Sequence, residues 1–234
     1  MKKINLLSSL FVCLFVCLFV CLGCTNDNRT EEHSELPDGA IFSENFVLAY
    51  VIPDAITVTM PKDRYLHIAF NGREISTLDR DTKELFNSLC AKNNDLSFNR
   101  RIVPGTTKAL GKNFAAIQVV CNTAIDATHP AGSSLNDMIK ICAMSYNDFV
   151  QGKYDDSFRP SECPAEFKPF FSGHEQGETP VFKLLSELTK MDLQLLTPEI
   201  YLYFTQPLRS GTYEFTITMR ADDGDLTTKC VVGV

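Results

Sequence analysis

The sequence predicts a mainly β protein of the α+β class, an antiparallel β-sandwich with two or three helical insertions. Segments rich in β-branched and aromatic residues open and close the globular part of the chain, which indicates strands at both ends. The last two segments alternate apolar and polar residues across an Asp-Gly turn, as the strands of an antiparallel hairpin do. Between these ends, helical and strand patterns are mixed.

Three short strands are expected first, at 46–52, 55–60 and 65–70. Pro53-Asp54 and Pro61-Lys62-Asp63 separate them, and such residues are typical of the turns of a meander. Asn71-Gly72 predicts a further turn.

A short helix is expected over 82–92. Apolar residues recur there at helical spacing, and Asp81 with Glu84 resembles a capping box. Polar residues with Gly and Pro predict a loop over 93–112. The apolar run 114–121 then predicts a strand that is central and buried.

The segment after the turn at 129–134 fits two structures. Apolar residues from Leu135 to Phe149 recur at steps of three and four, which predicts a helix capped by Ser134, with Asp137 in its first turn. A strand over 138–143 is the alternative.

Residues 151–178 are rich in Pro, Gly and charge, and are expected to form a long irregular excursion. Thr179-Pro180 predicts the start of a helix that ends near Lys190.

The clearest local pattern lies at the C-terminus. Residues 213–219 and 226–232 alternate on either side of an acidic turn at 222–225, so a hairpin is expected, with 200–204 as a third strand beside it. A strand that starts Gly211-Thr212-Tyr213 and a hairpin that closes the domain resemble immunoglobulin-like sandwiches. The predicted fold is therefore an Ig-like sandwich that occupies 41–234 as a single domain.

The first 24 residues have the layout of a secretory signal. Lys2 and Lys3 precede an apolar run, Leu10 to Leu22, that is too short for a membrane-spanning helix. Cys24 directly after Leu-Gly resembles the lipobox of bacterial lipoproteins, a family in which the chain is cut before a Cys whose thiol carries a diacylglycerol. Residues 1–23 are thus the expected signal peptide and Cys24 the expected lipidation site. An uncleaved anchor and an ordinary secreted protein are the alternatives.

Residues 24–40 are expected to form a flexible acidic tether, because 25–35 contain no apolar residue whose burial could offset the entropy of ordering. Cleavage removes two lysines and no acid, so the 22 basic and 29 acidic residues become 20 and 29, a net charge of −9. This charge disfavours nucleic acid as a partner. The basic stretch within 100–112 is expected to be a solvated loop.

Five cysteines remain beyond the lipobox: Cys90, Cys121, Cys142, Cys163 and Cys230. Their number is odd, and their spacing fits no zinc site. Buried free thiols are expected, with one disulfide as the alternative.

The sequence contains no complete motif for catalysis, for binding a cofactor or for binding a metal. Gly105–Asn113 resembles a phosphate loop, but its second Gly comes one residue late and a strand follows it. His174-Glu175 lacks the second His of the zinc-protease motif, and the acidic turn at 222–225 lacks the ligand spacing of a calcium loop. Ser133 and Ser134 fit helix capping. We therefore expect a protein that is not an enzyme and binds no cofactor.

Aromatic residues gather around the 151–178 excursion: Tyr146, Phe149, Tyr154, Phe158, Phe167, Phe170 and Phe171. Most are expected to pack in the core or under the loop, and an exposed patch among them is the first candidate for a binding surface. The absence of Trp disfavours a sugar ligand. The 17 Phe and 7 Tyr residues, however, keep a sugar ligand among the alternatives.

The lipobox at Cys24, the acidic tether, the His-Pro-Ala-Gly-Ser stretch at 129–133 and the hairpin over 211–232 together resemble envelope lipoproteins of the Bacteroidetes type. The resemblance implies lipid attachment to the bacterial outer membrane, on its periplasmic face or at the cell surface, and no assigned activity. The expected function is a non-catalytic binding or assembly module with a protein or glycan ligand. The alternatives are an envelope or surface hydrolase, whose site is built from residues distant in sequence, and a surface-fibre subunit.

Overall fold

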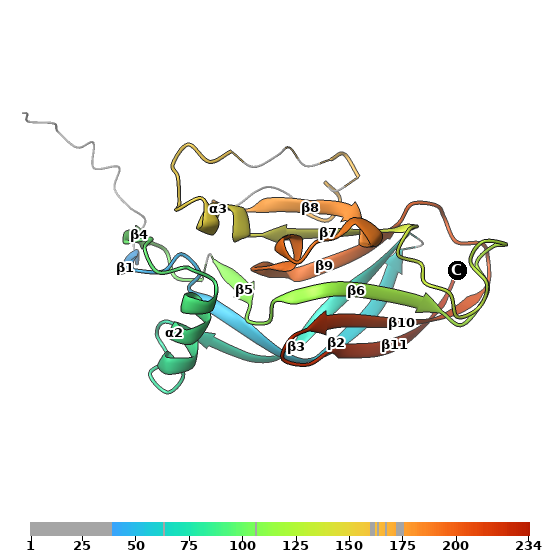
Figure 1. The fold of residues 1–234 in the computed structure, drawn as a ribbon, viewed down its shortest axis with the longest axis horizontal. Helices are drawn as coiled ribbons and strands as arrows, with labels where there is room; N and C mark the ends of the chain where they lie inside the picture. Colours follow the sequence, from blue (N-terminus) through green and yellow to red (C-terminus); the bar gives the residue numbers. More distant parts are fainter. Residues whose placement is uncertain are drawn as a thin grey trace, which may run out of the picture. The chain divides into compact units, whose positions relative to one another are not determined.

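The computed structural model describes residues 39–62, 64–105, 107–159, 162, 164–166, 168–171 and 176–234. The expected signal peptide, Cys24 and nearly all of the tether lie outside these residues. From Gly39 to Val234 the chain forms one compact unit in which two packed sheets make a β-sandwich (Figure 1). The prediction of a mainly β sandwich with few helices is confirmed.

The larger sheet has six strands in the order β5-β2-β3-β9-β7-β8. All neighbours are antiparallel except β2 and β5, which are parallel. The strands are β2 (Ala49–Lys62), β3 (Tyr65–Ser76), β5 (Lys108–Leu110), β7 (Ile139–Ser145), β8 (Thr179–Leu184) and β9 (Leu196–Phe204).

The smaller sheet has three antiparallel strands in the order β11-β10-β6. These are β6 (Phe114–Cys121), β10 (Thr212–Ala221) and β11 (Leu226–Gly233). A short ribbon pairs β1 (Ile41–Ser43) with β4 (Arg100–Ile102). The helical elements are α2 (Lys83–Lys92), α3 (Asn147–Gln151) and the 3-10 turns η1 (Leu185–Glu187) and η2 (Met191–Leu193).

The main core lies between the two sheets. Alternate residues of β9 and β10 point inward, and the rings of Phe204 and Phe215 lie 5.6 Å apart there. Both rings and the neighbouring Leu202 and Ile217 are 0% exposed. Complete burial of one such side chain stabilises the fold by about 1.5–3 kcal/mol.

A second core holds α2 and α3 against one end of the larger sheet. Phe86 and Cys90 of α2 and Phe149 of α3 pack there with Phe46 and Tyr50. The same core contains Tyr146 and Tyr154, so three of the aromatic residues that the sequence places around the excursion are core residues, as expected.

The first strands differ from the sequence prediction. The segments expected at 46–52 and 55–60 belong to one long strand, β2, which is bulged between Pro53 and Ala55. The turn expected at Asn71-Gly72 is wrong, because β3 continues through it and Gly72 pairs with Pro53. Proline donates no ladder hydrogen bond, and a bulge is one of the places in a sheet that tolerate it.

The expected helix over 82–92 is confirmed as α2, but its capping box is wrong. Thr82 occupies the N-cap position without a side-chain cap bond, and its hydroxyl donates instead to Asp79 at 2.7 Å. The loop expected over 93–112 contains the short strands β4 and β5.

The helix expected from Leu135 to Phe149 is wrong, and the alternative strand is right. Residues 139–145 form β7, which is buried on both faces, so its apolar residues show no alternation. The helix expected after Thr179-Pro180 is also wrong, since these residues begin β8 at the edge of the sheet. Proline is tolerated at an edge because no partner there requires its missing N–H.

The C-terminal hairpin is confirmed, with Phe215 opposite Cys230 and Met219 opposite Leu226. Residues 200–204 do not join it: they lie in β9, between β3 and β7 in the larger sheet. β6 takes that place beside β10, so the prediction of a central position for β6 is wrong. The described residues between α3 and β8 form turns and irregular backbone, as expected for the excursion.

An aromatic sheet face and the His129 cluster

The outer face of the larger sheet is aromatic. In β9, Ile200, Leu202 and Phe204 point into the core, so the period-two alternation of a strand turns Tyr201 and Tyr203 outward. These two tyrosines are half-buried. Strand pairing extends their positions into two rows across β3, β9, β7 and β8, which lie side by side in Figure 1.

The first row runs through His67, Tyr201, Cys142 and Phe182. The rings of His67 and Tyr201 stack with centroids 4.8 Å apart and an interplanar angle of 24°. At this distance two nearly parallel rings on adjacent strands are stacked, so each covers part of one face of the other. Cys142 lies fully buried within this row.

The second row runs through Tyr65, Tyr203, Lys140 and Leu184. Two cations lie over rings of these rows: Lys140 Nζ is 4.6 Å from the centroid of Phe182, and Cζ of Arg64, the residue before β3, is 5.5 Å from that of Tyr203. Neither cation forms an ion pair with a residue that the structure describes.

Phe170, from the excursion, packs onto both rows. Its ring meets Tyr65 edge-on at 4.6 Å and Tyr201 at 4.8 Å. We call the half-buried rings of Tyr65, His67, Phe170, Phe182, Tyr201 and Tyr203 the outer aromatic face. The sequence pointed to Phe170 and Phe171 but missed the other members. The signal that could have found them is the pair of tyrosines at the outward positions of the strand over 200–204.

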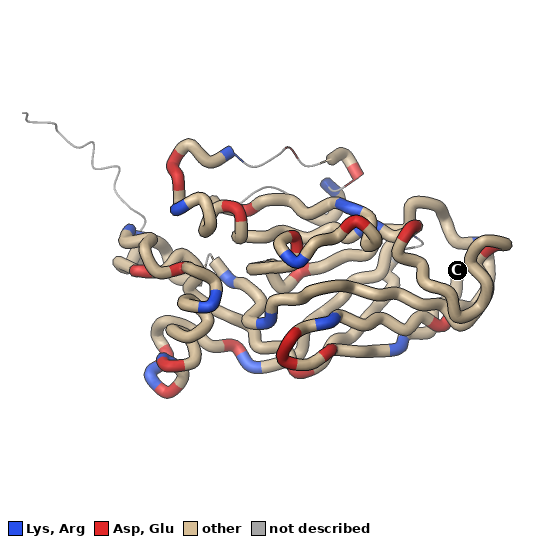
Figure 2. The backbone as a smooth tube through the Cα atoms, in the orientation of Figure 1, with Lys and Arg blue, Asp and Glu red and all other residues tan. Residues whose placement is uncertain are grey.

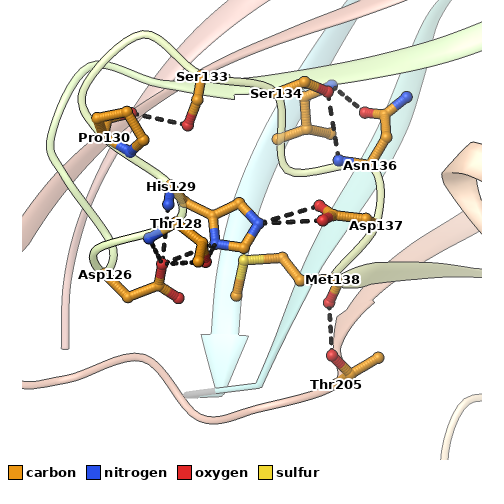
Figure 3. Close-up of polar contacts among 11 residues, drawn as sticks. Asp126, Thr128, His129, Pro130, Ser133, Ser134, Asn136, Asp137, Met138 and Thr205 are labelled. Atoms are coloured by element: carbon orange, nitrogen blue, oxygen red, sulfur yellow. Dashed lines mark hydrogen bonds and ion pairs between the residues drawn. The ribbon is translucent and has the colours of Figure 1, made fainter.

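His129 lies in a polar cluster in the β6–β7 connection (Figure 3). Its Nδ1 is 2.9 Å from Oδ1 of Asp126, and its Nε2 is 3.1 Å from Oδ1 of Asp137. Asp126 Oδ1 also accepts hydrogen bonds from the Thr128 and His129 amides, each at 2.8 Å. The contact with Asp126, and then that with Asp137, raises the pKa of the imidazole. Hydrogen bonds from Thr128 and then from His129 lower the pKa of the Asp126 carboxyl.

This cluster holds the loop together and lacks the arrangement of a catalytic triad. Both ring nitrogens of His129 face carboxylates, so neither is free to take a proton from a nucleophile. The Ser133 hydroxyl donates to the Pro130 carbonyl at 2.7 Å, and Ser134 Oγ accepts from the Asn136 amide at 3.3 Å. The helix cap predicted for Ser134 is wrong, because no helix follows it.

The described cysteines are free thiols: Cys90, Cys121 and Cys142 are buried, and Cys230 is half-buried. Burial raises the pKa of Cys90 to about 12 and that of Cys230 to about 11, so neither is an activated nucleophile. Cys163 and His174 lie outside the described residues.

The acidic turn at 222–225 joins β10 to β11 (Figure 2). Lys112 Nζ lies 3.1 Å from Asp223 Oδ1 and also donates to the Gly224 carbonyl. Among the described residues, no group of three or more His, Cys, Asp or Glu side chains could hold a metal ion.

The basic stretch within 100–112 is largely paired with acids. Arg100 pairs with Asp156, and Lys108 Nζ lies 2.7 Å from Glu74 Oε2. The residues that resembled a phosphate loop contain β5 and lead directly into β6, so no helix N-terminus is present to bind a phosphate.

A small cavity of about 240 Å³ lies between the start of β8 and η2, where Asp148, Lys183, Met191 and Asp192 contribute to its lining. Lys183 Nζ is 2.6 Å from Asp192 Oδ1, so these charges neutralise each other. The lining residues include no His or Cys.

No protein-family model matches the chain, and no curated protein or solved structure matches it. In the part of the chain that the structure describes, no helix is long and apolar enough to cross a membrane. The fold and the site together define a β-sandwich protein with an aromatic outer sheet face.

Proposed function

We propose that this protein is a lipid-anchored lipoprotein of the bacterial outer membrane, and that its sandwich is a non-catalytic binding module. The observation that carries the binding role is the gathering of half-buried rings, with His67 and Tyr201 stacked among them, on the outer aromatic face. Half-exposed aromatic side chains that gather on one face of a small domain favour recognition of a ligand. The carboxylates on both nitrogens of His129 and the raised thiol pKa values favour binding over hydrolysis.

The anchor is supported by the charged start, the short apolar run and the Leu-Gly-Cys sequence that ends at Cys24. Several acyl chains contribute about 0.8 kcal/mol per buried CH₂, which makes attachment effectively permanent. Palmitate labelling and detergent partitioning of Cys24→Ser test it, with Cys13→Ser, in the apolar run before the lipobox, as the matched control inside the signal. We expect Cys24→Ser alone to lose the label and leave the detergent phase. Continued partitioning of Cys24→Ser would rule out this anchor.

The binding role is tested by retention on immobilised polysaccharide and protein fractions prepared from bacterial envelopes and growth medium. The double variant Tyr201→Leu/Tyr203→Leu should lose retention while keeping its folded circular dichroism spectrum. Phe42→Leu is the control, because Phe42 is an exposed aromatic residue, 65% accessible, that lies outside the outer aromatic face. Equal retention of the wild type and the double variant would contradict the proposed function.

A further inference from the structure

Exposed apolar side chains are concentrated on the segments that open the sandwich. Among the described residues, six large hydrophobic side chains are exposed: Phe42, Leu78, Leu85, Leu96, Met191 and Val231. The first four lie in β1, in the β3–α2 connection, in α2 and directly after α2. Single exposed apolar residues are ordinary, but four of six on neighbouring segments favour a contact surface.

These segments meet at one end of the compact unit. The Phe98 amide donates to the Glu44 carbonyl at 2.9 Å, so the chain after α2, with Leu96, runs beside the ribbon that contains Phe42. The buried face of α2 packs in the second core against the residues that follow β1 and against β4. Figure 1 shows β1, β4 and α2 together at this end, whereas the C-terminus is marked at the other end.

The chain that leads back to Cys24 leaves the sandwich at the same end. Gly39 lies two residues before β1 and follows Cys24 by 15 residues. A chain of this length spans about 50 Å when fully extended, and a polar coil of this length averages about 20 Å between its ends. A lipid anchor at Cys24 would therefore keep the end with β1, β4 and α2 closest to the bilayer.

The chemistry of this end suits the boundary between lipid headgroups and acyl chains. Phe42 pairs with Arg101 across the ribbon, and both side chains are exposed. An aromatic ring can enter the acyl boundary while a neighbouring guanidinium binds a lipid phosphate. Exposed charged residues, such as Lys83 and Lys92, lie between the apolar ones along the chain, whereas the centres of protein–protein interfaces are depleted of charge.

We propose that the end of the sandwich formed by β1, β4 and α2 lies on the bilayer that carries the anchor. Phe42 and Leu96 reach the acyl boundary, and Arg101 contacts lipid phosphates. This inference rests on the proposed lipid anchor. A few apolar side chains bind a membrane weakly by themselves, but the anchor makes their contact intramolecular and so raises their effective concentration.

Fluorescence quenching tests this contact, because the sequence contains no Trp and one introduced Trp reports only its own surroundings. Phe42→Trp and Leu96→Trp are made in the full lipidated chain, which is placed in phosphatidylcholine vesicles with brominated acyl chains that quench indole on contact. Val231→Trp is the matched control, because Val231 is 66% exposed and lies near the C-terminus. We expect Phe42→Trp and Leu96→Trp to lose about half of their emission and Val231→Trp to lose less than about a tenth. Equal quenching of Phe42→Trp and Val231→Trp would overturn the inference, as would no quenching of Phe42→Trp and Leu96→Trp.

A second substitution locates the contact. Adding Leu96→Ser to Phe42→Trp should reduce quenching about twofold, whereas adding Val231→Ser should leave it unchanged. An equal effect of the two additions would overturn the inference.

Two further measurements separate the alternatives. A chain that floats with the vesicles while Phe42→Trp stays unquenched would refute the contact and leave the anchor standing, whereas a chain that does not float would refute both. Shielding of Phe42→Trp from aqueous iodide in native membranes but not in lipid vesicles would mean that a protein partner covers this end, and would also overturn the inference.

Discussion

The hydroxyl of Tyr154 donates a 2.8 Å hydrogen bond to Oδ1 of Asp95, and both residues are buried. The same carboxylate accepts the Phe46 amide at 2.8 Å and the Val47 amide at 2.9 Å. Asp95 thus ties the segment after α2 to the chain that enters β2 and to the start of the excursion. Burial raises the pKa of the Asp95 carboxyl, although all three donors oppose this effect.

Asp95→Ala should destabilise the protein by about 3–5 kcal/mol, because it leaves three buried donors without an acceptor. Tyr154→Phe removes one donor and keeps the ring, so its cost should be smaller, about 1.5–3 kcal/mol. Urea unfolding measures both, with the exposed Asp54→Asn as a control that should stay within about 0.5 kcal/mol of wild type. An Asp95→Ala cost below that of Tyr154→Phe would contradict the role of Asp95 as the shared acceptor.

Gly72→Ala should weaken the β2–β3 pairing at the bulge. A Cβ atom at Gly72 would lie 2.0 Å from the Ile52 carbonyl oxygen, so the backbone of one strand has to move. We expect a loss of about 2–4 kcal/mol in the free energy of unfolding. Gly233→Ala is the matched control, because nothing lies within 4 Å of its new Cβ atom. Equal thermal midpoints for the two variants would show that the backbone at the bulge accommodates the methyl group without a loss of stability.

The C-terminal hairpin and β7 show which parts of the fold the local pattern of apolar and polar residues can predict. The hairpin over 213–232 alternates because one face of each strand is buried and the other is solvated, so its pattern reports its structure directly. β7 is covered on both sides, with Ile141 in the core between the sheets and Met144 under the aromatic residues of the outer face. Its apolar residues therefore do not alternate, and their spacing resembles that of a helix.

The candidate site was less accessible to sequence analysis than the fold. His67, Lys140 and Tyr201 become neighbours only through the strand order β3-β9-β7, which no local pattern specifies. The single local hint was the presence of tyrosine at both outward positions of the strand over 200–204, where a solvated sheet face would carry polar residues.

Asn136 covers the free edge of β6 with its side chain. Its Oδ1 accepts the Val119 amide at 3.1 Å, and its Nδ2 donates to the Ile117 carbonyl at 2.8 Å, as a neighbouring strand would. Asn136→Ala should cost about 1–3 kcal/mol and speed hydrogen exchange at the Val119 amide. Asn136→Asp keeps the acceptor and loses the donor, so that amide should stay protected. Loss of Val119 protection in both variants would show that the side-chain acceptor is not what protects it.

The ion pairs of His129 predict a pH dependence of stability with a definite sign. Because Asp126 and Asp137 raise the pKa of His129, its contribution is complete below the unfolded value of about 6.5 and is lost as pH rises through the higher folded value. The lowered pKa of Asp126 acts in the opposite direction, and its contribution is lost only as pH falls below the ordinary carboxyl range.

His129→Gln retains hydrogen-bonding capacity without the charge. Urea unfolding at pH 6, 7, 8 and 9 should show a wild-type advantage over His129→Gln that shrinks as pH rises. The change should be modest, since the carboxylates are exposed to solvent. An advantage that is the same at pH 6 and pH 9 would mean that the contribution of His129 does not depend on its charge.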